Sequence, residues 1–184
     1  MSHEKLISQG LLGVVLLLLI VSLSTVHWKT WKSDVGNSTS VSQDIGLWKV
    51  CGTGDSNKLS ASSCMSIDSA AGVYDDSSLS ALKTVRVMAI LTLVFAGLAL
   101  LLEFAEDIPA MQQMTQQLPK MLPMILLALA SLLSIVVISV YASKVKPISV
   151  AGMSYDLGYS YVLQVVAMIG LLICTALAFK KRSQ

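Results

Sequence analysis

Charged residues are scarce in this sequence. Only 13% of its 184 residues are Asp, Glu, Lys or Arg, about half the share found in a typical soluble domain. Hydrophobic residues make up 54%. This balance excludes an ordinary water-soluble protein and indicates an integral membrane protein. The net charge of +2 is too small to suggest nucleic-acid binding. The basic residues are scattered and form no basic stripe with interleaved aromatics.

Groups that carry catalysis or bind metals are equally few. The two histidines, His3 and His27, are far apart in the sequence, and the topology expected below puts them on opposite sides of the membrane, which excludes a shared metal site. The sequence contains no Gly-rich phosphate loop and no nucleophile with a matching base. Glu103, Glu106 and Asp107 cluster with no His or Arg in the same loop, as at a hydrated helix end. We therefore expect no enzyme activity and no cofactor.

Long apolar runs dominate the chain. A transmembrane helix needs about 20 mainly apolar residues, and four runs of that length cover residues 6–26, 82–102, 121–142 and 158–179. The first run has a second interpretation. Lys5, the Leu-rich core and the "SLS" at residues 22–24 also resemble a cleavable secretory signal, whose removal would leave three spans and one terminus outside.

The basic tail sets the expected orientation. Lys180, Lys181 and Arg182 directly follow the last run, as at a cytoplasmic helix end. Four spans then place both termini in the cytoplasm. The loop 103–120 is cytoplasmic, and the segments 27–81 and 143–157 are extracellular. The inner loop is not basic and Lys29 and Lys32 lie outside, so the positive-inside rule is only partly obeyed, but the features of the first outer segment outweigh this.

The first outer segment carries two cysteines in a polar stretch. Cys51 and Cys64 flank the turn-rich sequence "GTGDSNKLSASS", and a cysteine pair in such a segment fits a disulfide on an oxidising face; the alternative is two free thiols in a cytosolic loop. Closing so short a loop stabilises the fold by roughly 3 kcal/mol. Asn37 begins an Asn-Ser-Thr sequon and is a candidate glycosylation site, which also requires a lumenal face.

The residue pattern of the same segment predicts short strands. The stretches "VHWKTWKS" and "STSVSQDIGLWKVC" carry β-branched and aromatic residues that partly alternate with polar ones, a pattern typical of strands. Asp55 and Lys58 in the intervening turn carry opposite charges, as in a solvated turn, and give no basis for predicting a preference for cations or anions.

The order of residues around the first two spans resembles the claudin signature. It consists of a tryptophan at the exit of the first span, a Gly-Leu-Trp motif, two cysteines, and an arginine opening the second span: Trp28, Gly46, Leu47, Trp48, Cys51, Cys64 and Arg86. The second outer segment is similar to the claudin pattern that leads into the fourth helix, at Tyr155, Asp156, Leu157 and Gly158. The resemblance covers all four spans and both outer segments.

The resemblance implies a membrane α+β fold, with residues 1–184 in one domain. It consists of a left-handed bundle of four transmembrane helices that carries a small extracellular antiparallel sheet, with four strands from the first outer segment and one from the second. Since indole prefers the membrane interface, Trp28 and Trp48 should seat the sheet on the bilayer. Arg86, near a helix end, can reach backbone carbonyls there. Cys174 is either a candidate acylation site or a packed core thiol.

The function implied is that of a non-enzymatic junction protein at the plasma membrane. Such a protein forms a paracellular barrier or channel by lateral and trans self-assembly, with copies of itself or related claudin-like proteins as partners in the lipid bilayer. An alternative comes from the wider superfamily, which includes peripheral myelin proteins, epithelial membrane proteins and calcium-channel gamma subunits. The "GYSY" at residues 158–161 resembles those relatives as well, and predicts an auxiliary subunit of a channel or receptor. A membrane enzyme or transporter is a weaker third alternative.

Overall fold

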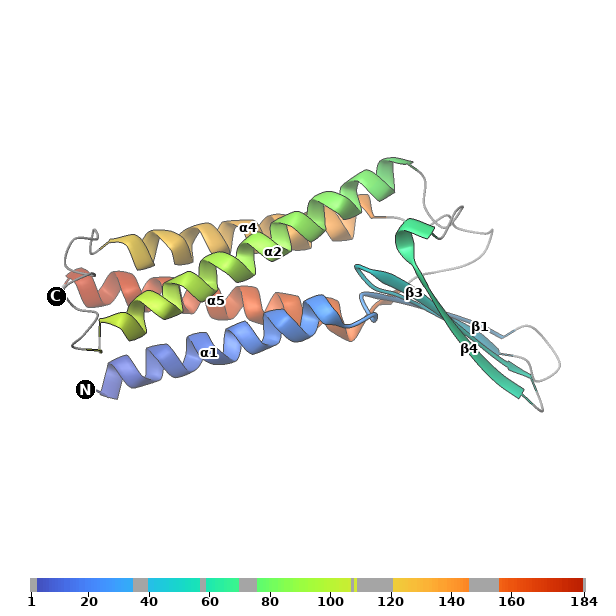
Figure 1. Cartoon of the computed structure of the whole chain (residues 1–184), viewed down its shortest axis with the longest axis horizontal. Helices are drawn as coiled ribbons and strands as arrows, with labels where there is room; N and C mark the ends of the chain where they lie inside the picture. The colour runs from blue at the N-terminus through green and yellow to red at the C-terminus, as the bar shows by residue number, and fades with distance from the viewer. Residues whose placement is uncertain are drawn as a thin grey trace. The chain divides into compact units, whose positions relative to one another are not determined.

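The computed structural model describes residues 3–34, 40–56, 59–69, 76–106, 108, 121–145 and 156–183. These residues form four long helices, a five-stranded sheet and one short 3-10 helix (Figure 1). The chain divides into two compact units. The helix unit comprises Met1–Ile20, Val87–Ser139 and Gln164–Gln184, and the sheet unit comprises Val21–Arg86 and Val140–Leu163.

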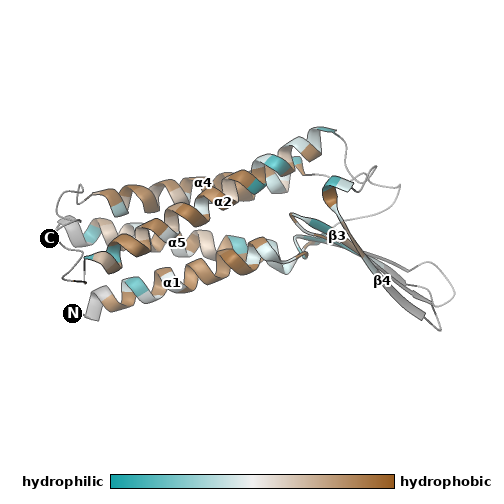
Figure 2. Cartoon of the chain, viewed as in Figure 1, coloured by the Kyte–Doolittle hydropathy of each residue, from teal (hydrophilic) through white to brown (hydrophobic). Residues whose placement is uncertain are grey.

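The long helices are α1 (His3–Ser24), α2 (Asp76–Ala105), α4 (Leu122–Lys144) and α5 (Tyr159–Ser183). Each contains a stretch long and apolar enough to cross a membrane, and Figure 2 shows hydrophobic residues along most of their length. The chain is therefore a multi-pass membrane protein.

All four helices extend past the apolar runs from which they were predicted, and α2 and α5 do so by the most residues. Helix α2 begins at Asp76 rather than near residue 82, and α5 continues through Ser183. Hydropathy marks only the apolar part of a helix, whereas backbone hydrogen bonding continues into polar sequence. Asp76 in the first turn of α2 and Lys180 near the end of α5 also complement the helix dipoles.

The core of the helix unit combines leucines with small residues. Four of its members are alanines, which let helix backbones approach closely where lipid supplies no hydrophobic driving force. The buried cluster consists of Leu12, Val15, Leu19, Ala96, Ala99, Leu127, Ala130, Ala167, Leu171 and Cys174. All four helices contribute to it, so the cluster accounts for their packing into one bundle.

The sheet is antiparallel throughout, in the order β4-β3-β2-β1-β5. Its strands are β1 (Lys29–Asp34), β2 (Ser40–Ile45), β3 (Lys49–Ser56), β4 (Leu59–Ser66) and β5 (Asp156–Leu157). Four strands thus come from the segment between α1 and α2, and one comes from the segment between α4 and α5. The predicted fold class, four apolar helices with a small antiparallel sheet, is confirmed.

The register gives the two faces of the sheet different chemistry, because alternate residues of a strand point to opposite faces. One row of opposed residues, here called the core row, is Leu157–Lys29–Ile45–Val50–Met65. The adjacent row lies on the other face and is here called the polar row: Asp156–Thr30–Asp44–Cys51–Cys64. The middle of the core row is buried, but Met65 and Leu157, on the two edge strands, are 51% and 49% exposed.

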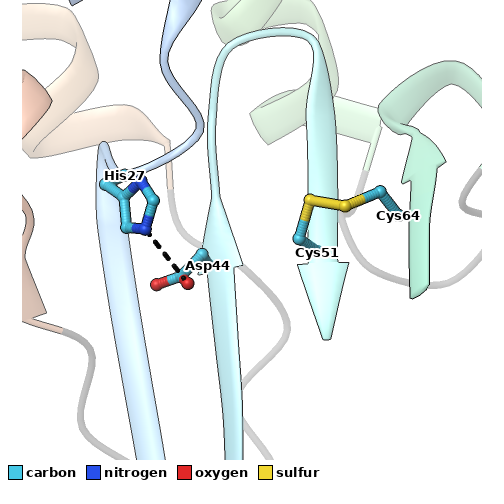
Figure 3. Close-up of a disulfide and its surroundings, with 4 residues drawn as sticks. All are labelled: His27, Asp44, Cys51 and Cys64. Carbon is cyan, nitrogen blue, oxygen red and sulfur yellow. Dashed lines mark ion pairs between the residues drawn. A yellow bond between two sulfur atoms is a disulfide. The ribbon is translucent and has the colours of Figure 1, made fainter. Parts of the chain in front are cut away.

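The disulfide lies within the polar row. Cys51 on β3 and Cys64 on β4 are directly opposed, with Cα atoms 4.1 Å apart (Figure 3). The predicted disulfide is therefore present, and it ties the edge strand β4 to the adjacent strand β3.

Removing the disulfide should weaken the sheet measurably. We expect the variant with both Cys51→Ser and Cys64→Ser to lose about 3 kcal/mol of unfolding free energy, because the bond closes a loop in the unfolded chain. Thermal unfolding of the purified protein in lipid nanodiscs would measure this. Reductant should lower the stability of the wild type by a similar amount and leave the variant unchanged; a variant as stable as the oxidised wild type would contradict the expectation.

Candidate functional site

The signature residues gather where α1 ends and the sheet begins. We call Trp28, Gly46, Leu47, Trp48 and Arg86 the signature cluster; all five belong to the sheet unit. Helix α1 ends at Ser24, and the last carbonyls of a helix lack partners within it. The Trp28 indole Nε1 donates to the Ser22 carbonyl at 2.8 Å, and the Trp48 Nε1 donates to the Leu23 carbonyl at 2.8 Å. The two tryptophans therefore cap successive carbonyls of one helix end.

The two tryptophans differ in exposure. Trp28 is fully buried, with its ring 4.7 Å from the Tyr141 ring and 6.3 Å from the Tyr161 ring between centroids. Trp48 is 39% exposed. An interfacial role, which the sequence suggested for both residues, therefore fits only Trp48. Trp28 is a core residue whose N–H is satisfied by a helix end.

Arg86 joins α2 to the turn between β2 and β3. Its Nε donates to the Leu47 carbonyl at 2.6 Å, and its Nη1 lies 3.2 Å and 3.3 Å from the two carboxylate oxygens of Asp68. The guanidinium also lies 5.1 Å from the centroid of the Trp48 ring. A buried cation needs such partners, because loss of hydration is costly. The Nη2 atom is buried and has no hydrogen-bond partner among the described residues.

Two glycines are required by close backbone approach. A Cβ on Gly46 would lie 2.7 Å from the Cα of Val26, and a Cβ on Gly158 would lie 2.0 Å from the carbonyl oxygen of His27. At the second site the Gly158 N–H donates to the Trp28 carbonyl, and the Ser160 N–H donates to the His27 carbonyl. Any side chain at Gly158 would push β5 and the start of α5 away from this strand entry.

The remaining sequence candidates are distributed as follows. Asp156 and Leu157 form β5, pairing with Thr30 and Lys29, and both are exposed. Cys174 is 1% exposed within the helix-unit core, an arrangement that favours a packed thiol over an acylated one. Asn37 and Tyr155 lie outside the described residues.

Several contacts around the cluster carried no recognisable sequence signal. Asp68, the partner of Arg86, lies in the 3-10 helix Ile67–Ser69. The His27 Nε2 lies 3.3 Å from the Asp44 carboxylate (Figure 3), and the His27 ring stacks on Tyr159 with centroids 4.7 Å apart. These residues are brought together by strand register and by the return of α5, which a single sequence does not specify.

The contacts of the signature cluster are structural. Within the described parts of the chain, no three His, Cys, Asp or Glu residues are grouped as a metal site would require. Apart from the Arg86 Nη2, the polar side-chain atoms of the cluster are directed to backbone carbonyls and to Asp68, and so they serve to join helix ends to the sheet.

Truncating Trp28 should be more damaging than truncating Trp48. We expect Trp28→Ala to cost about 3–5 kcal/mol of unfolding free energy, as for other fully packed aromatics, and Trp48→Ala to cost less because that ring is partly exposed. Thermal unfolding and the fraction of protein that reaches the cell surface would measure both effects. Lys49→Ala, at an exposed neighbour, should be mild. Equal loss in the two tryptophan variants would contradict the expected order.

Gly158→Ala should disrupt the junction between β1 and α5. The added methyl group would meet rigid backbone rather than a movable side chain, so we expect a destabilisation of about 1–3 kcal/mol. Gly52→Ala is the matched control, since a Cβ there would meet nothing within 4 Å. Unfolding midpoints of the two variants would decide the matter, and the expectation fails if both alanines are tolerated equally.

The comparisons with known proteins agree with this architecture. The chain matches the family model described as PMP-22/EMP/MP20/Claudin over residues 6–178. That stretch includes the whole signature cluster, both cysteines of the disulfide and β5. A search of the curated proteins finds no match. Because the family model covers most of the chain, the protein belongs to the PMP-22/EMP/MP20/Claudin family.

Proposed function

We propose that this protein is a claudin-like junction protein that self-assembles laterally and between cells into a paracellular barrier or channel. The observation that carries the proposal is the sheet. Its core row ends in two exposed hydrophobic residues on opposite edges, Met65 and Leu157. An edge of one copy that meets the opposite edge of the next makes a head-to-tail contact, and such contacts generate open filaments when they do not close into rings.

The polar row supports the second half of the proposal. It lies on the face opposite the core row and carries Asp44, Asp156 and the disulfide. An assembled series of such sheets would present a continuous polar surface, which a water-filled path between cells requires. The proposed topology has both termini in the cytoplasm and the sheet outside the cell, in keeping with the disulfide and with the basic residues 180–182.

Complementary substitutions at the two edges test the proposal. In cells that lack junctional strands, the wild type should form strands at cell contacts, visible by freeze-fracture electron microscopy. Met65→Asp alone and Leu157→Lys alone should each abolish them, because each places an unpaired charge in an apolar contact. The double variant should restore them in part, since the two new charges attract.

Ser66→Asp is the matched control. Ser66 is exposed on the same edge strand, but its position in the register is on the other face, so strands should persist. All variants should reach the surface in equal amounts, as measured by surface biotinylation. A wild type that reaches the surface but forms no strands would refute self-assembly, and co-purification with a channel or receptor would then favour the auxiliary-subunit alternative.

A further inference from the structure

Lys29 is a buried lysine in the middle of the core row. It is 7% exposed, between Leu157 and the fully buried Ile45 in the register. Burying a lysine removes water from its charged ammonium group, which is costly unless other groups of the protein bind the ammonium instead. An apolar residue of similar length would fill this position without that cost. The compensation shows what the residue does.

The ammonium group of Lys29 lies at the C-terminal end of α4. Its Nζ donates to the carbonyl of Val145, the residue directly after that helix, and lies 5.4 Å from the centroid of the Tyr141 ring. The preceding carbonyl, of Lys144, accepts from the Ser78 hydroxyl at 3.2 Å. The final carbonyls of a helix lack internal partners and carry its partial negative charge. A cation from another element thus caps this helix end.

The backbone of Lys29 holds a second point of the chain. In the register it pairs with Leu157 of β5, and the neighbouring Trp28 carbonyl accepts from the Gly158 N–H. The second outer segment leaves α4 at Val145 and returns at β5. Lys29 therefore fixes both ends of that segment. Its side chain binds the segment at Val145, and its main chain pairs with Leu157 where the segment returns.

We propose that Lys29 is a positioning residue that caps α4 in trans and so sets where the second outer segment departs and returns. The cap acts through charge: the ammonium group meets the negative end of α4, while the aliphatic stem fills the core row. The role goes beyond self-assembly and does not depend on it, because it concerns the geometry of one molecule.

Hydrogen exchange of the full-length protein in lipid nanodiscs tests this. Lys29→Met keeps the aliphatic stem and removes the charge, so the last turn of α4, residues 141–145, should fray and its amides should exchange about tenfold faster. Lys29→Arg keeps the charge, so the amides of residues 141–145 in this variant should exchange at a rate within about twofold of that in the wild type. Amides of β3 should be unchanged in both variants, which separates loss of the cap from general destabilisation. Lys49→Met, at an exposed lysine, is the control and should leave α4 unaffected.

Each outcome bears on the proposal. Unchanged exchange of residues 141–145 in Lys29→Met would overturn it, as would equal acceleration in Lys29→Arg and Lys29→Met, since shape rather than charge would then matter. If Lys29→Met yields no folded protein, the yields of folded Lys29→Arg and Lys29→Leu test the proposal instead. Folding of Lys29→Arg together with failure of Lys29→Leu supports the charged cap, and failure of Lys29→Arg overturns it.

Discussion

The sheet unit depends on how a transmembrane helix ends. Helix α1 ends at Ser24, so its last carbonyls have no hydrogen-bond donors within the helix. An unsatisfied carbonyl near the hydrocarbon of a membrane is costly. The indoles of Trp28 and Trp48 fill successive positions there. Each indole belongs to the segment between α1 and α2, so satisfying the helix end also fixes the entry into β1 and the turn before β3. The Gly-Leu-Trp motif is thus a helix-capping device as well as a sequence marker.

From that constraint the sheet follows by register. Once Trp28 is fixed, Lys29 starts β1 on the buried face, and the period of two assigns every opposed residue of the core and polar rows. A slip of one residue would bury Asp44 and the disulfide and expose Ile45 and Val50. The glycines at positions 46 and 158 allow the close backbone approaches on which this register depends.

The four apolar helices and the disulfide could be predicted from local signals, namely the length of the apolar runs and the two cysteines in a turn-rich stretch. The division of the sheet into four strands from one segment and one from another was implied only by the resemblance to claudins. The polar contacts were less predictable. Arg86 was expected to reach a carbonyl and does so, but its second partner, Asp68, lies in a 3-10 turn with no sequence signal. The burial of Lys29 was not predicted either, because its site is created by the return of β5 and the end of α4.

Arg86 and Lys29 solve the same physical problem in different ways. Both are cations buried in the sheet unit, and both bind backbone carbonyls at points where the chain turns. Arg86 presents several donors and spans a carbonyl, a carboxylate and an indole face at once, which suits a guanidinium fork. Lys29 delivers a compact charge to one helix end across an aromatic ring. Because a main-chain carbonyl is not removed when a side chain is substituted, the contacts to the Leu47 and Val145 carbonyls depend on the two cations.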